Sequence, residues 1–109
     1  MKKETRISVW NMRAMLRSIR NRVLAGETFL CLYWGQIKAE LSRIEPNTDL
    51  TPYSKHHRIK MDAFKIRLTE CWRAIEDDPA HPGFVVCFYG KPWGLFKRFS
   101  EGSGDRPEV

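Results

Sequence analysis

The chain of 109 residues lacks any long uninterrupted hydrophobic run. A helix that crosses a bilayer needs about 18 consecutive apolar residues. The opening segment MKKETRISVW has no apolar stretch behind its cations that could act as a secretory signal. These absences predict a cytoplasmic protein with no membrane partner.

Cysteine is scarce, and Cys31, Cys71 and Cys87 form no C-x-x-C pair. Their odd number and wide spacing argue against a zinc site or a redox-active disulfide. A free cysteine usually behaves as a small buried hydrophobic residue. We therefore expect reduced, mostly buried thiols.

The sequence also lacks the common signatures of enzymes, including G-x-G-x-x-G, a P-loop, a nucleophile elbow and a histidine-carboxylate metal motif. His56 and His57 are adjacent, so on a helix they cannot chelate one metal, and His57 falls on an apolar stripe as an interior histidine would. The acids at 76–78 and nearby His81 could perform acid–base chemistry only in an enclosed pocket. We expect neither catalysis nor a metal or cofactor.

Negative charge is nearly absent from the N-terminal segment. Residues 1–24 carry seven lysines and arginines against Glu4 alone, whereas residues 25–109 contain 12 cations and 12 anions. The whole net charge of +6 therefore lies in the first segment. Such asymmetry predicts an anionic partner, which can be a nucleic acid, an acidic protein surface or a membrane surface.

Apolar residues spaced three and four apart predict three helices, within residues 8–24, 29–44 and 52–76. Gly26 ends the first helix, and prolines end the other two. The third helix interleaves acids and bases, as a solvated face does. The side chains expected to be deeply buried are Leu16, Ile19, Trp34, Leu41, Phe64, Leu68 and Trp72.

After residue 83 the pattern changes to β-branched and aromatic residues. FVVCFY and LFKRF, separated by GKPWG, predict a two-stranded ribbon within residues 84–99. Both faces of its first strand are apolar, so one face is either covered or available to a partner. No internal repeat is apparent. The expected fold is a mainly α (α+β) domain over residues 1–99, a three-helix bundle followed by a C-terminal β-hairpin, with a polar tail at 100–109.

Two basic, aromatic surfaces are the candidates for partner binding. Trp10 lies among arginines on the side of the first helix that faces away from its apolar stripe, although it could instead pack beneath the hairpin. Trp93 stands in a tight turn from which it cannot easily reach the core. Arginine and tryptophan together suit an anionic surface with a pocket for an aromatic ring. The predicted partner-binding residues are Arg6, Trp10, Arg13, Arg17, Arg20, Lys91, Trp93, Lys97 and Arg98.

These features favour a small, non-enzymatic, basic regulatory protein that docks on another protein with an acidic surface. An enzyme that processes nucleic acid is a suitable partner, inhibited or modulated in the manner of phage and mobile-element inhibitors. The alternative is direct DNA or RNA binding by the arginine and tryptophan face of the first helix.

Overall fold

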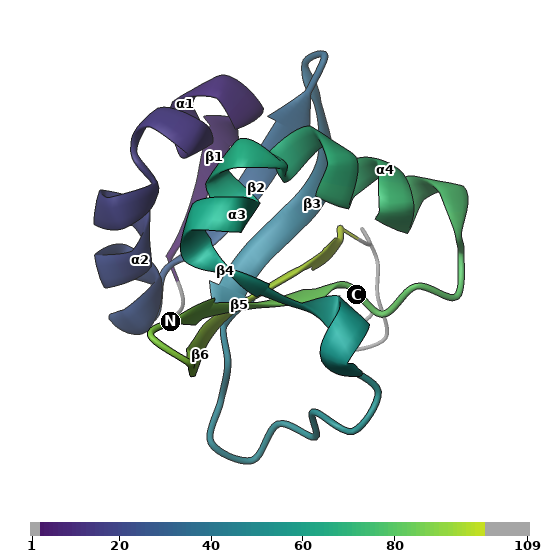
Figure 1. Ribbon diagram of the computed structural model, residues 1–109. Coiled ribbons are helices and arrows are strands. Elements are labelled where there is room, and N and C mark those ends of the chain that lie inside the picture. Colours follow the sequence, from purple (N-terminus) through teal and green to yellow (C-terminus); the bar gives the residue numbers. More distant parts are fainter. Residues whose placement is uncertain (1–2, 100–109) are drawn as a thin grey trace, which may run out of the picture.

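The computed structural model describes residues 3–99 and shows a six-stranded mixed sheet with four short helices on one face (Figure 1). The polar tail predicted at 100–109 lies outside the described residues. Within residues 3–99, no helix is long and apolar enough to cross a membrane. The elements are β1 (Glu4–Ser8), α1 (Val9–Ala14), α2 (Leu16–Leu24), β2 (Thr28–Tyr33), β3 (Gln36–Arg43), the 3-10 helix η1 (Lys55–His57), β4 (Arg58–Lys60), α3 (Met61–Ile66), α4 (Leu68–Asp77), β5 (Phe84–Phe88) and β6 (Lys91–Arg98).

The strand order is β1-β2-β3-β6-β5-β4. The two outer pairs, β1 with β2 and β4 with β5, are parallel. The hairpins β2–β3 and β5–β6 are antiparallel, and β3 pairs antiparallel with β6 at the centre. Because the helices share one face, the two halves of the chain are related by an approximate two-fold axis perpendicular to the sheet.

Each half of the chain is one βααββ unit, so the expectation of no internal repeat is wrong. The local irregularities recur at equivalent places. The helical segment is interrupted at Met15 in the first unit and at Arg67 in the second, with φ of −113° and −106°. The hairpins have irregular pairing after Cys31 and after Val86. The two units share the order of their elements, the pattern of polar and apolar residues and the backbone geometry. Few side chains are identical at equivalent positions, so the sequence does not reveal the repeat.

The predicted three-helix bundle is wrong, mainly because residues 29–44 form the hairpin β2–β3. Phe29 and Cys31 pack with the helices in the main core, while Leu30, which points to the other side, is also buried. With apolar residues on both faces, the strand does not show the alternation that distinguishes a strand from a helix. Its turn is Trp34–Gly35, which is not one of the usual hairpin dipeptides.

The other two predicted helices are shorter than expected. The first is broken at Met15, and Ser8 caps its beginning by accepting a hydrogen bond from the Asn11 amide at 3.2 Å. The third begins only at Met61, after a long connection that contains Pro52. The ribbon within 84–99 is confirmed as β5–β6, although its turn lies at Tyr89–Gly90, ahead of the expected position.

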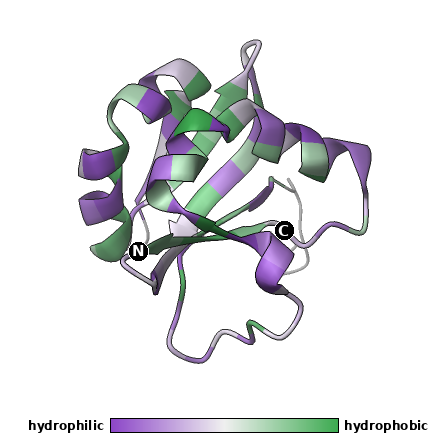
Figure 2. Cartoon of the chain, viewed as in Figure 1, coloured by the Kyte–Doolittle hydropathy of each residue, from purple (hydrophilic) through white to green (hydrophobic). Residues whose placement is uncertain are grey.

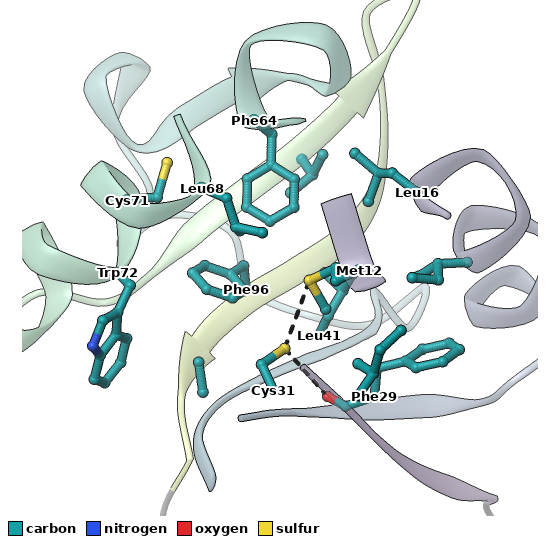
Figure 3. Close-up of a cluster of buried hydrophobic side chains, with 14 of the residues drawn as sticks. Met12, Leu16, Phe29, Cys31, Leu41, Phe64, Leu68, Cys71, Trp72 and Phe96 are labelled. Carbon is teal, nitrogen blue, oxygen red and sulfur yellow. Dashed lines mark hydrogen bonds between the residues drawn. The ribbon is translucent and has the colours of Figure 1, made fainter. Parts of the chain in front are cut away.

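The core lies between the sheet and the apolar sides of the helices (Figure 3). Six of the seven side chains expected to be deeply buried are buried, and the exception is Trp34 at a hairpin tip. The rings of Phe64 and Phe96 meet edge to face at 5.1 Å. Figure 2 shows the complementary distribution, with hydrophilic residues over much of α2 and hydrophobic stretches along the strands.

The cysteines are free, as expected. Cys31 and Cys71 are buried and Cys87 is half-buried. Burial raises the pKa of the Cys31 thiol, and it raises the pKa of Cys71 to about 11. Both thiols therefore stay protonated at neutral pH and are poor nucleophiles.

Candidate partner-binding surfaces

The structure separates the predicted partner-binding residues instead of gathering them. Arg6 belongs to β1 and not to the first helix. Its neighbour Ile7 lies in the core beneath the helices, so Arg6 points to the opposite face of the sheet. Trp10, Arg13 and Arg17 remain on the helical side.

Trp10 is exposed to solvent over 72% of its surface, so the alternative that it packs beneath the hairpin is wrong. The guanidinium carbon of Arg13 lies 5.4 Å from the centre of its ring. Arg13 also donates a hydrogen bond of 3.4 Å to the Thr69 hydroxyl of α4. The arginine is thus held between the two units and supports the exposed indole from one side.

The contact between Arg13 and Thr69 places the end of α1 beside the start of α4. By the approximate two-fold axis, the end of α3 lies toward the start of α2, and Phe64 and Leu16 point into the same part of the core (Figure 3). Two further large apolar side chains are exposed at these helix ends, Met15 at 43% and Ile66 at 76%. We call the exposed surface formed by Trp10, Arg13, Met15, Arg17 and Ile66 the helical patch.

Arg20 is not part of the helical patch. Its guanidinium carbon lies 4.3 Å from the centre of the Phe88 ring, so the side chain reaches down toward the second hairpin. Its Nε is buried without a hydrogen-bond partner among residues 3–99. Arg20 therefore joins α2 to β5 rather than facing a partner.

The residues expected at the second hairpin mostly have structural contacts. Trp93 is only 3% exposed and belongs to the core, so the expected contact site at this tip is wrong. The turn precedes it, and the irregular pairing of β5 with β6 lets its side chain enter the interior. Lys97 pairs with Glu40 at 3.7 Å, and Arg98 donates to the backbone oxygen of Ile75 at the end of α4. Lys91 alone of this group is exposed with no such contact in the described part of the chain.

The two hairpin tips carry aromatic residues that sequence analysis missed. Trp34 is 100% exposed and Tyr89 is 90% exposed. Both have positive φ, 54° and 52°, and each is followed by a glycine at 78°. The sequence did contain a signal for these tips. Two apolar runs each end in an aromatic residue followed by glycine, in YWG and in FYG.

A shallow hollow of about 470 Å³ lies beside the first tip, on the sheet face opposite the helices. Its lining residues are Arg6, Leu32, Gly35, Gln36, Ile37 and Phe99. A second hollow of about 310 Å³ lies at the other edge of the sheet and is lined in part by Arg67, Glu70 and Cys71.

The histidines form a small aromatic cluster near the second hollow. The rings of His57 and His81 lie 4.7 Å apart, and His81 lies 4.9 Å from Phe84. His57 is half-buried and bonds Ser54, so it is not the interior residue that was expected. Within the described residues, no three histidine, cysteine or acidic side chains form a group that could hold a metal. The acids at 76–78 are exposed.

Comparisons with protein-family models, with curated proteins and with solved structures give no significant match. The surfaces must therefore be interpreted from their own geometry.

Proposed function

We propose that this protein is a regulatory module that docks through the helical patch on another protein with an acidic surface. The observation that carries this proposal is the exposed Trp10, supported by Arg13, on a helical layer that also exposes Met15 and Ile66. Tryptophan, arginine and methionine are enriched where protein interfaces bury their central contacts. A side chain already held in place also loses less conformational entropy on binding.

The internal repeat gives an independent argument for an anionic partner. The helical residues of the first unit include four arginines and no acid. The equivalent helices of the second unit contain Asp62, Glu70, Glu76 and Asp77 as well as two cations. Since both units have the same fold, the topology itself does not require a cationic helical segment. Arg20 and Arg22 have structural contacts, so the charge available for a function is that of Arg17 and of the half-buried Arg13.

The same comparison favours a protein over a nucleic acid at this patch. A duplex lying across the helices would meet the acids of α3 and α4, which repel phosphates. The exposed apolar groups of Met15 and Ile66 also contribute little to phosphate binding. We place the partner among enzymes that process nucleic acid, which this protein would inhibit or modulate. The sheet face opposite the helices has a hollow that contains Arg6 beside the exposed Trp34. This face suits the nucleic-acid strand on which such an enzyme acts.

Affinity capture from a lysate of the producing cells, after nuclease treatment, tests the proposal. The wild type should retain a protein partner, while Arg13→Glu/Arg17→Glu and Trp10→Ala should lose it. The control Arg43→Glu/Lys55→Glu makes the same change of charge at exposed positions outside the patch and should retain the partner. Arg17 is exposed, whereas Arg13 is half-buried and bonds Thr69, so melting curves of all variants must show that each is folded before loss of the partner is assigned to the patch.

Two outcomes contradict the proposal. One is equal loss of the partner in the control variant, which would show that net charge alone is responsible. The other is loss of every partner after nuclease, with binding of purified duplex DNA whose log affinity falls with log salt by about 0.9 per neutralised phosphate. That outcome would favour direct nucleic-acid binding through the helices.

A further inference from the structure

Two unusual features meet at the tip of the β2–β3 hairpin, at the end of the sheet where Ser8 of β1 pairs with Leu32. One is the backbone conformation of Trp34, and the other is the hollow that contains Arg6.

Trp34 is held in a conformation that its side chain disfavours. For a residue other than glycine, positive φ is disfavoured, and this turn position usually holds asparagine, aspartate or glycine. No packing within the described structure compensates, because the indole is 100% exposed. The second unit has the same arrangement at Tyr89. Such strain is typical of binding sites, and because both tips share it, the hollow beside Trp34 is what distinguishes this tip.

The hollow has the composition of a site for a flat group with an adjacent negative charge. Leu32, Ile37 and Phe99 supply apolar and aromatic surface, and Arg6 stands at its side. Among residues 3–99, the Arg6 guanidinium has neither an ion pair nor a hydrogen-bond partner. No acid lines the hollow.

We propose that Trp34 and this hollow form a binding site for single-stranded nucleic acid. One base stacks on the exposed indole, a neighbouring base enters the hollow against Phe99, and Arg6 binds the phosphate between them. Base stacking on aromatic side chains and phosphate binding by arginine are the usual contacts of single-strand binding. A duplex does not fit this arrangement, because its bases are already stacked on one another. The site shares no residue with the helical patch and does not depend on docking there.

The repeat provides matched controls for each residue of the site. Arg58 is the equivalent of Arg6, and its Nε donates to the backbone oxygen of Tyr53 at 3.4 Å. Tyr89 is the equivalent of Trp34. The variants Trp34→Asn and Tyr89→Asn make the same kind of change at equivalent turns, and Arg6→Gln and Arg58→Gln remove the same charge.

The experiment measures binding of the full chain to a fluorescein-labelled ten-nucleotide oligothymidine by fluorescence anisotropy. Trp34→Asn and Arg6→Gln should each weaken binding about tenfold, in the range of one lost stacking or phosphate contact. Tyr89→Asn and Arg58→Gln should bind within about twofold of the wild type, and a duplex of equal length should bind more weakly than the single strand.

Trp34→Asn should also raise the melting temperature, because asparagine tolerates the turn conformation better. Loss of binding in a more stable protein cannot be attributed to unfolding, and Arg6→Gln gives a second measurement at a surface residue. The proposal is overturned if the wild type does not bind the oligonucleotide, or if Trp34→Asn and Arg6→Gln bind as well as the wild type. Equal weakening in all four variants, or tighter binding of the duplex, overturns it as well.

Discussion

Glu27 lies between α2 and β2 and connects three parts of the first unit. Its carboxylate accepts hydrogen bonds from Arg22 Nε at 2.8 Å and Arg22 Nη2 at 2.5 Å, and another from the Thr5 hydroxyl. The Arg22 guanidinium in turn lies 4.9 Å from the centre of the Phe29 ring. Arg22 therefore belongs to the structure of the unit, although it contributes to the cationic N-terminal segment.

Replacing Glu27 with glutamine should lower the free energy of unfolding by about 1 to 2 kcal/mol at pH 7, as the loss of a charged hydrogen-bond partner does. The Arg22 hydrogen bonds hold the pKa of Glu27 below its usual value of 4.5. The stabilisation is therefore present above pH 4.5 and is lost as the pH falls through the folded-state pKa. Urea unfolding should show the two proteins converging in acid, and a constant difference at all pH values would contradict this assignment.

His81 should make the fold sensitive to mild acid. Partial burial lowers its pKa from 6.5, and neighbouring His57 adds to this effect. Its Nδ1 also accepts a hydrogen bond of 3.0 Å from the Gly83 amide, which a protonated Nδ1 cannot do. Since protonation of His81 favours the unfolded chain, the contribution of His81 to the free energy of unfolding is present above pH 6.5. This contribution is lost as the pH falls through the folded-state pKa.

The variant His81→Asn tests this effect, because the asparagine side-chain oxygen can accept the same hydrogen bond without titrating in this range. Its melting temperature should fall less than that of the wild type between pH 7.5 and pH 5.5. An equal fall in both proteins would assign the pH sensitivity to other groups. Asp78 and Arg98 are the charged neighbours that also act on His81, and they oppose each other.

At the scale of elements, the helix breaks define how each unit packs. Leu16 follows the first break and Leu68 the second, and both are buried at equivalent positions, 3% and 1% exposed. Figure 3 shows both side chains directed into the core near Phe64. Each leucine anchors the second helix of its unit over the sheet.

Leu16→Ala and Leu68→Ala should each lower the free energy of unfolding by about 2 to 5 kcal/mol, as large-to-small changes in a packed core do. Chemical denaturation gives the values, and they should be similar because the sites are equivalent. A loss below about 1 kcal/mol at either position would place that leucine outside the core. Leu24→Ala, at an exposed position of α2, is the control.

The elements that could be predicted from sequence are those with an unambiguous period. The apolar stripe of the helix predicted over residues 52–76 matches α3 and α4 from Met61 onward, and the β-branched run after residue 83 matches β5. The helix predicted over residues 29–44 was wrong because β2 is buried on both faces. Its apolar residues therefore matched a helical spacing of three and four by coincidence. The breaks at Met15 and Arg67 carry no proline or glycine, so no local sequence signal marks them.

The candidate sites divide in the same way. Periodicity correctly placed Trp10 and Arg17 away from the core, although the break at Met15 puts them in different helices, and Arg13 is half-buried. It could not place Trp93 or Trp34, whose exposure depends on where each hairpin turns. If the position of a turn is predicted wrongly by a few residues, a buried tryptophan such as Trp93 is taken to be exposed, and an exposed one such as Trp34 is taken to be buried.

At the scale of the molecule, two copies of one unit have acquired different surfaces. The first unit carries the excess positive charge, the exposed Trp10 and the hollow beside Trp34. The second unit supplies an acidic helix surface and contributes Ile66 to the helical patch. The helices and the open sheet face thus present two separate binding surfaces, and we propose that one takes a protein and the other a nucleic-acid strand.

The most direct test of this division is to measure both activities on one set of variants: capture of the nuclease-resistant protein partner, and anisotropy of the labelled oligothymidine. Arg13→Glu/Arg17→Glu should lose the protein partner while binding the oligonucleotide within about threefold of the wild type, a small change expected from net charge. Trp34→Asn should retain the protein partner and lose most oligonucleotide affinity. If the helix variant abolishes oligonucleotide binding, or the tip variant abolishes capture, the two surfaces do not have separate functions and the account is wrong.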